Sequence, residues 1–150
     1  MTDRRTPRNP AYAARVHASL ASQPFMDRLI AARATRIEPG FVEIEAALRP
    51  DLLQPGGHAH GSVLAALGDS ATGYAAQTLL AAEFHIVTVE FKINYLAPAF
   101  GPRVVARGRV LRPGRTLSVC AAEMVSIAAD GAETQVAHLV TTMMAVPTHD

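Results

Sequence analysis

Apolar and polar residues alternate along six segments of the chain, which is the pattern of β-strands with one buried face. Two of them, residues 34–37 and 41–49, flank the turn Glu38-Pro39-Gly40 and predict a hairpin. The other four segments follow later and are separated by short turns, at residues 86–96, 103–112, 116–127 and 134–146.

The alternation is most regular in the segment 86–96. It places one apolar set on a single face, namely Val87, Val89, Phe91, Ile93 and Tyr95. The polar set, Thr88, Glu90, Lys92 and Asn94, falls on the other face. We therefore expect the apolar set to pack on the core.

A helical period runs from about Ser62 to Ala81, between the two groups of strands. One broad apolar stripe follows this period and consists of Val63, Leu64, Leu67, Ala71, Tyr74, Ala75 and Thr78. Strands joined by short turns run antiparallel, and their common apolar face needs a cover. The sequence thus predicts an α+β domain at 33–150, with a five- to six-stranded antiparallel sheet wrapped around one long helix. Residues 1–32 predict a frayed start and short helices.

Asp69 is the only charged residue between Gly61 and Ala82. It lies opposite the apolar stripe, among small or uncharged residues: Ser62, Ala65, Thr72, Gly73, Ala76 and Leu80. A solvated helix face normally carries several charges, so we expect a second copy to cover this face and to leave a ligand slot in it. Partial burial would raise the pKa of the carboxyl group, which suits a base or nucleophile. The alternative is that Asp69 is the N-cap of a shorter helix.

The loop before this helix contains a second set of candidate residues. The N–H groups of Gly61 and Ser62 have no partner within the helix and lie at the positive end of its dipole, where an anionic oxygen is favoured. Gly61 also has no side chain to shield its N–H from a substrate carbonyl. A metal site made of His58, His60 and Asp69 is a weaker alternative, because no further ligand stands at suitable spacing. His60 alone is equally consistent with a structural role in the loop.

The composition of the chain indicates how many domains it forms and which kinds of partner it lacks. The 150 residues are 49% apolar and carry a net charge of +1, so we expect one domain, an extra surface covered by a partner, and no nucleic-acid partner. The single cysteine, Cys120, has no intramolecular disulfide partner. With neither a signal-peptide pattern nor a long apolar span, we expect a cytoplasmic protein without a membrane partner, and we expect no cofactor.

Three stretches together carry a family resemblance. The pattern Gln54-x5-His60-Gly61-x7-Asp69, followed by TVEFKINYLAPA at 88–99 and GRVLRPGRTLSVCAAEM at 108–124, resembles the hotdog-fold acyl-CoA thioesterases of the PaaI type, which include hydroxybenzoyl-CoA thioesterases. The resemblance implies a hotdog fold and an acyl-CoA substrate. It also implies a homodimer with joined sheets and active sites across the interface, usually assembled into a homotetramer.

The resemblance also implies roles for individual residues. Asp69 corresponds to the acidic nucleophile or general base, and Gly61 to the backbone N–H that polarises the thioester carbonyl. Gln54 matches an amide that helps to place the thioester or water. His60 belongs to the same loop, and Thr88 falls where relatives carry a serine or threonine near the attacking water.

Substrate binding is expected at further positions. Arg103, Arg107 and Arg109 share a strand face and predict a basic patch for the CoA phosphates; an ordinary solvated strand face is the alternative. Ser62 and Gly73 complete the predicted substrate-binding set.

Two other functions remain open at this point. A hotdog hydratase or dehydratase would use His60 with Asp69, although a His-Phe-Pro type of loop is absent. A non-catalytic, regulatory acyl-CoA-binding protein is the other alternative. The sequence does not determine the acyl group.

Overall fold

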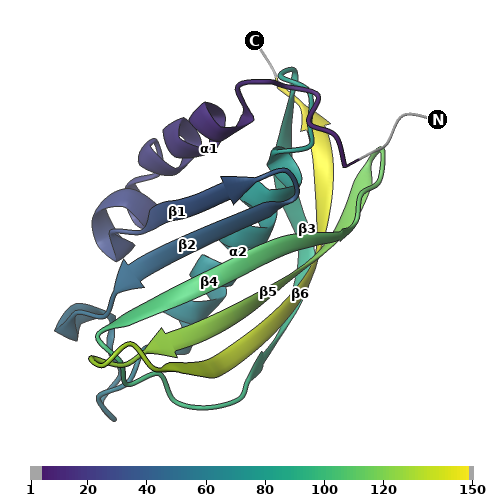
Figure 1. The fold of residues 1–150 in the computed structure, drawn as a ribbon. Helices are drawn as coiled ribbons and strands as arrows, with labels where there is room; N and C mark the ends of the chain where they lie inside the picture. The colour runs from purple at the N-terminus through teal and green to yellow at the C-terminus, as the bar shows by residue number, and fades with distance from the viewer. Residues whose placement is uncertain (1–4, 149–150) are drawn as a thin grey trace.

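The six predicted strands are all present and pair in one antiparallel sheet within residues 5–148, the part of the chain that the computed structural model describes. They are β1 (Arg33–Glu38), β2 (Phe41–Ala47), β3 (Phe84–Tyr95), β4 (Arg103–Arg112), β5 (Leu117–Ile127) and β6 (Glu133–Pro147). Their order across the sheet is β1-β2-β4-β5-β6-β3, so that β1 and β3 are the two edge strands. The curved sheet wraps around a central helix (Figure 1), which confirms the predicted hotdog architecture.

That central helix is α2 (Gly61–Gln77). Every residue of the predicted apolar stripe is buried. The helix approaches β4 closely at Gly108, where a Cβ atom would lie 2.3 Å from the backbone of Ala71. Gly108 therefore allows the sheet to close over the helix.

The helix ends four residues before the predicted Ala81. Thr78 anchors this end, because its hydroxyl group donates to the carbonyl oxygen of Ala75 and accepts from the N–H of Gly40, both at 2.7 Å. Gly40 lies in the turn between β1 and β2 with a φ of 75°, a conformation that favours glycine. The contact to this turn fixes where the chain leaves the helix.

The N-terminal segment is helical, as predicted, over α1 (Tyr12–Ala21) and a π-helical turn, η1 (Phe25–Ile30). A 3₁₀ turn, η2 (Pro50–Leu52), follows β2. The helix α1 lies beside β1 (Figure 1), and Val16, Leu20, Met26 and Ile30 join the same core as α2. The predicted frayed start falls partly on residues 1–4, which lie outside the described residues.

Strand β3 corrects the predicted alternation. Its pairing with β6 shifts register between Thr88 and Glu90, which is a β-bulge around Val89. Because a bulge exchanges the two faces, Ile86 and Thr88 face the helix before it, whereas Ile93 and Tyr95 do so after it. The prediction that Val87 and Val89 share the core face with Tyr95 is therefore wrong, and Val89 is 53% exposed.

The far face of α2 also differs from the expectation. Thr72, Gly73 and Ala76 are already buried within a single chain, so a second copy is not needed to cover them. The Thr72 hydroxyl group donates to the carbonyl oxygens of Gly68 and Asp69. Within α2, only the N-terminal half of this face, from Ser62 to Ser70, keeps accessible residues, and Leu80, which follows the helix, is partly exposed. None of the helices within residues 5–148 has the length and apolar character that a membrane span requires.

Candidate active site

Asp69 lies in the third turn of α2, and this position overturns the alternative that it is the N-cap of a shorter helix. Its carboxylate is half-buried, and Oδ1 accepts a hydrogen bond of 2.7 Å from the Thr88 hydroxyl group on β3. Burial raises the pKa of the Asp69 carboxyl group above its ordinary value, while the hydrogen bond from Thr88 lowers it in part. The bulge in β3 turns Thr88 toward the helix and so makes this contact.

A small pocket of about 130 Å³ opens beside Asp69. Its lining consists of Gln23, Asp69, Ser70, Gly73, Tyr74, Ile86 and Thr88. Gly73, a predicted substrate-binding residue, lies one helical turn after Asp69 and leaves space that a side chain would fill. This pocket contains a carboxylate, which can act as a general base, and the hydroxyl group of Thr88 that binds it.

The loop before α2 is held by its own hydrogen bonds. Gln54 Nε2 donates to Nδ1 of His58 at 2.9 Å, and the Gln54 N–H donates to the His58 carbonyl oxygen at 3.0 Å. Gly57 adopts a φ of 78° in the turn between them. The ring of His58 also packs edge-on against Phe100, with centroids 5.4 Å apart. These contacts fix Gln54, which lines a cleft together with His58.

His60 is the N-cap of α2. Its Nδ1 accepts from the N–H of Ser62 at 3.2 Å and lies 2.7 Å from the Ser62 hydroxyl oxygen. This arrangement supports the structural role of His60, and within one chain His60 does not pair with Asp69 in the way a hydratase would use. The metal alternative has no support either, because the described residues contain no group of three potential ligands and His58 has other partners.

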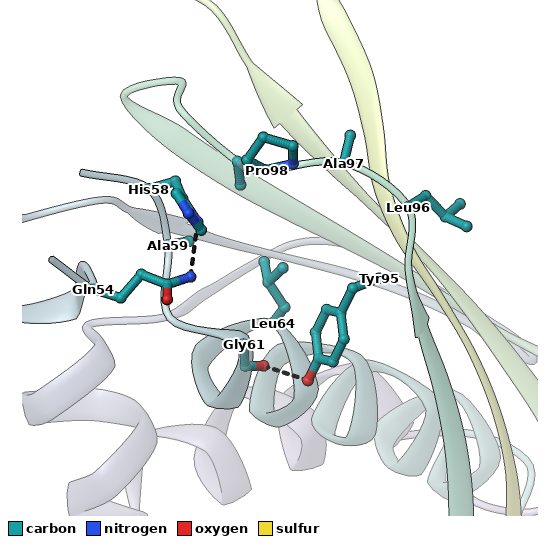
Figure 2. A pocket seen from close by; sticks show the side chains of 10 residues that line it. Gln54, His58, Ala59, Gly61, Leu64, Tyr95, Leu96, Ala97 and Pro98 are labelled. Atoms are coloured by element: carbon teal, nitrogen blue, oxygen red, sulfur yellow. Dashed lines mark hydrogen bonds between the residues drawn. The ribbon is translucent and has the colours of Figure 1, made fainter. Parts of the chain in front are cut away.

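A cleft of about 510 Å³ lies over the start of α2. Figure 2 shows Tyr95 reaching from β3 to Gly61 on one side of this cleft, with Gln54 and His58 on the other. The Tyr95 hydroxyl group donates to the Gly61 carbonyl oxygen at 2.9 Å. Among the described residues, the Gly61 N–H has no acceptor. The cleft therefore offers one backbone donor at the positive end of a helix.

The structure thus brings the predicted residues together in two groups. Gln54, His60, Gly61 and Ser62 gather at the N-terminus of α2, and Asp69, Gly73 and Thr88 gather around its middle. Eight residues separate Gly61 from Asp69 along the helix, a rise of about 12 Å at 1.5 Å per residue. One chain does not place Asp69 next to the Gly61 N–H.

Comparisons with known proteins agree with this geometry. Residues 56–128 match the family model described as the thioesterase superfamily. A thioesterase family protein from Silicibacter pomeroyi is 39% identical, over 91% of this chain and 99% of that one, and its crystal structure superposes with a TM-score of 0.88. The chain belongs to the thioesterase superfamily.

Two further matches are more distant. A protein from Saccharolobus solfataricus, named as a candidate esterase, is 32% identical over 87 residues, which cover 58% of this chain and 61% of that protein. The PaaI protein of Escherichia coli is 18% identical, over 93% of this chain and 96% of its own, with a TM-score of 0.80. At this identity the PaaI match shows the fold alone. The prediction of a hydrolase acting on thioester bonds is confirmed at the level of the superfamily.

The three arginines of this thioesterase superfamily member do share one face of β4, on the side of the sheet away from α2. Each is paired with glutamate: Arg103 with Glu45 at 3.0 Å, Arg107 with Glu43 at 2.9 Å and Glu133 at 2.6 Å, and Arg109 with Glu123 at 2.8 Å. Four carboxylates thus face three guanidinium groups. This pairing favours the alternative of an ordinary solvated strand face.

Sequence reasoning missed several residues of this thioesterase fold that line the two pockets. The sequence predicts His58 only as a possible metal ligand and Tyr95 only as a core residue, and it gives no role to Gln23. Tyr95 could have been suspected, because an aromatic residue at the end of an edge strand is poorly placed for the core. Gln23 has no local signal, since its contact to Tyr74 joins residues 51 positions apart.

Proposed function

We propose that the protein is an acyl-CoA thioesterase that hydrolyses its substrate to a free acid and CoA, with each active site built from two copies of the chain. The observation that carries the proposal is the isolated Asp69 carboxylate. It is half-buried, accepts a hydrogen bond from Thr88, and is the only charge on a helix whose first N–H has no acceptor within residues 5–148. A buried carboxylate without a cation is costly unless it has a role, and perturbed acids of this kind concentrate in active sites.

The edge strand β3 supports a second copy as the missing partner. It ends the sheet, and its exposed apolar side chains include Val89 (53%) and Tyr95 (53%). Unpaired edges with apolar side chains favour pairing with another strand. Two copies joined through β3 would bring the helices α2 together, so that Asp69 of one copy could serve the Gly61 cleft of the other.

In the proposed reaction the Gly61 N–H binds the thioester carbonyl oxygen, and the carboxylate of Asp69 takes a proton from water. The water oxygen attacks the carbonyl carbon, and the Gly61 N–H stabilises the oxyanion that forms. The C–S bond then breaks, and the carboxyl group returns its proton to the CoA thiolate. Direct attack by Asp69, with an anhydride intermediate that water hydrolyses, is the alternative chemistry.

The roles of the remaining residues follow from their contacts. Thr88 holds Oδ1 of Asp69 and leaves Oδ2 for water. Gln54 directs its amide to the cleft, where it can bind the thioester, and Ser62 fixes His60 at the start of the helix. The paired arginines have no assigned part in this scheme.

A thiol-release assay tests the proposal. The protein should release free CoA from acyl-CoA substrates, and the Asp69→Asn variant, folded to the same extent, should not. Equal release by both proteins would remove Asp69 from the mechanism. Binding of acyl-CoA without release would favour a regulatory protein instead.

A further inference from the structure

The pocket beside Asp69 contains one residue from outside the helix and the edge strand. Asp69, Ser70, Gly73 and Tyr74 come from α2, and Ile86 and Thr88 come from β3. Gln23 comes from the turn between α1 and η1, more than 40 residues earlier in the chain. The N-terminal segment thus supplies part of the wall of the pocket.

Gln23 is fixed at both its backbone and its side chain. Its carbonyl oxygen accepts from the N–H groups of Met26 (3.0 Å) and Asp27 (2.8 Å) at the start of η1. Its side-chain Nε2 donates to the Tyr74 hydroxyl group at 2.7 Å. Tyr74 is buried, with 5% of its surface exposed, whereas Gln23 is exposed. The amide of Gln23 therefore lies between the pocket and solvent.

The sizes of the two cavities differ in a way that matters for a thioester. The carbonyl carbon carries two substituents, the acyl group and the long CoA arm. The cleft at Gly61 measures about 510 Å³, whereas the pocket at Asp69 measures about 130 Å³. The pocket at Asp69 thus has about a quarter of the volume of the cleft (130/510). The cleft suits the CoA arm, and the pocket suits a short acyl group.

A longer alkyl chain would meet the Gln23–Tyr74 hydrogen bond. To pass it, the chain would have to displace the amide and leave the buried Tyr74 hydroxyl group without its donor. Leaving a buried polar group unsatisfied is unfavourable, and an apolar chain end offers nothing in return. The hydrogen-bonded pair thus acts against long chains and leaves short ones unaffected.

We propose that Gln23 and Tyr74 are specificity-determining residues, which form a polar wall that restricts the enzyme to short acyl groups. This inference rests on the proposed function, because it takes the thioester carbonyl to lie at Asp69. It assigns a role in substrate selection to the N-terminal segment, which lies outside the matched family region at 56–128.

The test compares octanoyl-CoA with butyryl-CoA by the ratio of their kcat/KM values. The wild-type protein should prefer butyryl-CoA. Gln23→Ala should raise the ratio in favour of octanoyl-CoA by about tenfold or more, the lower range of what a pocket contact discriminates. Tyr74→Phe keeps the ring but loses the hydrogen bond, and it should raise the ratio by a smaller factor.

Ser19→Ala is the matched control. Ser19 accepts a hydrogen bond of 3.4 Å from Gln77, so it also links the N-terminal segment to α2, but it does not line the pocket. This variant should leave the ratio unchanged. The melting temperature of each variant shows whether it is folded. If Gln23→Ala is not folded, the ratio measured for Tyr74→Phe tests the proposed wall.

Three outcomes would contradict us in different ways. An unchanged ratio in folded Gln23→Ala or, failing that, in Tyr74→Phe overturns the proposed wall. A shift in Ser19→Ala as large as that in Gln23→Ala assigns the effect to docking of the segment and overturns it as well. Failure of the wild-type protein to hydrolyse any acyl-CoA contradicts the proposed function itself.

Discussion

The two groups of the proposed mechanism, the Gly61 N–H and the Asp69 carboxylate, lie on one helix but in different environments. At Gly61 the helix begins, and an N–H without an acceptor among the described residues faces a wide cleft at the positive end of the dipole. Asp69 lies in the middle of the helix, and its carboxyl group, which has a raised pKa, faces a narrow pocket. In the proposed mechanism the Gly61 region stabilises negative charge and the Asp69 region supplies the base. The two regions lie apart on one helix, so under this proposal each is half of a site that a second copy completes.

The carboxylate region should show the largest effect. Asp69→Asn removes the base while keeping the shape of the side chain, so kcat should fall by about 10²-fold to 10⁴-fold. Asp69→Glu keeps the charge but moves it by one carbon atom, and it should lose less activity. Steady-state kinetics on one acyl-CoA would measure both. Equal losses in the two variants would mean that charge at this position is not what matters.

The amide region allows a substitution that removes only the N–H. Gly61 is the first residue of α2 and follows an extended His60, with φ −64° and ψ 136°, so proline fits the backbone there. Loss of this donor in Gly61→Pro should lower kcat by about 10²-fold to 10³-fold. Gly61→Ala is the control, because its Cβ also lies 3.1 Å from the Tyr95 ring while the N–H remains. Similar losses in both variants would attribute the effect to crowding.

The hydrogen bond between Thr88 and Asp69 should set the pH dependence. The reaction needs the carboxylate ionised, so activity should fall as the pH drops through the raised pKa of Asp69. Thr88 lowers that pKa, and Thr88→Val should therefore move the acidic limb of the kcat profile to higher pH. At neutral pH the rate should fall by less than about tenfold, since the base remains.

Thr142→Val provides the comparison for this experiment. Thr142 also donates to a carboxylate, Glu90, but on the outer face of the sheet, away from both pockets. The kcat–pH profile of the Thr142→Val variant should match that of the wild-type protein. If the acidic limb shifts in Thr142→Val, or does not shift in Thr88→Val, the pH dependence does not report the ionisation of Asp69.

The smallest effect is expected on the outer face of the sheet. Arg107→Gln should leave KM for acyl-CoA within about twofold, because Glu43 and Glu133 already neutralise this guanidinium group and exposed pairs contribute little. A severalfold rise in KM, with kcat unchanged, would instead assign the arginine to the CoA phosphates.

The predictability of these features from sequence depends on how local their causes are. The strands and α2 follow from periodicity, and Asp69 stands out because no other charge shares its helix. The bulge at Val89 was not predictable, since it depends on how β3 pairs with β6. Alternation alone therefore predicts the wrong face for Val87 and Val89, whereas the family resemblance points to Thr88.

The remaining misses also involve contacts between distant residues. Gln23 reaches Tyr74, Tyr95 reaches Gly61, and Thr78 meets the Gly40 turn and so fixes the end of α2. No residue's neighbours in sequence indicate these contacts. They arise only when the sheet closes around the helix and brings separate elements together.

Complementation between two inactive variants tests the shared site most directly. Asp69→Asn and Gly61→Pro, carrying different tags, would be produced in the same cells, and dimers that contain both tags would be isolated. Each isolated mixed dimer should contain one intact site and one doubly substituted site, so it should show about half of wild-type activity, as expected for a two-fold interface. Mixed dimers as inactive as either parent would show that Asp69 and Gly61 do not act across two copies.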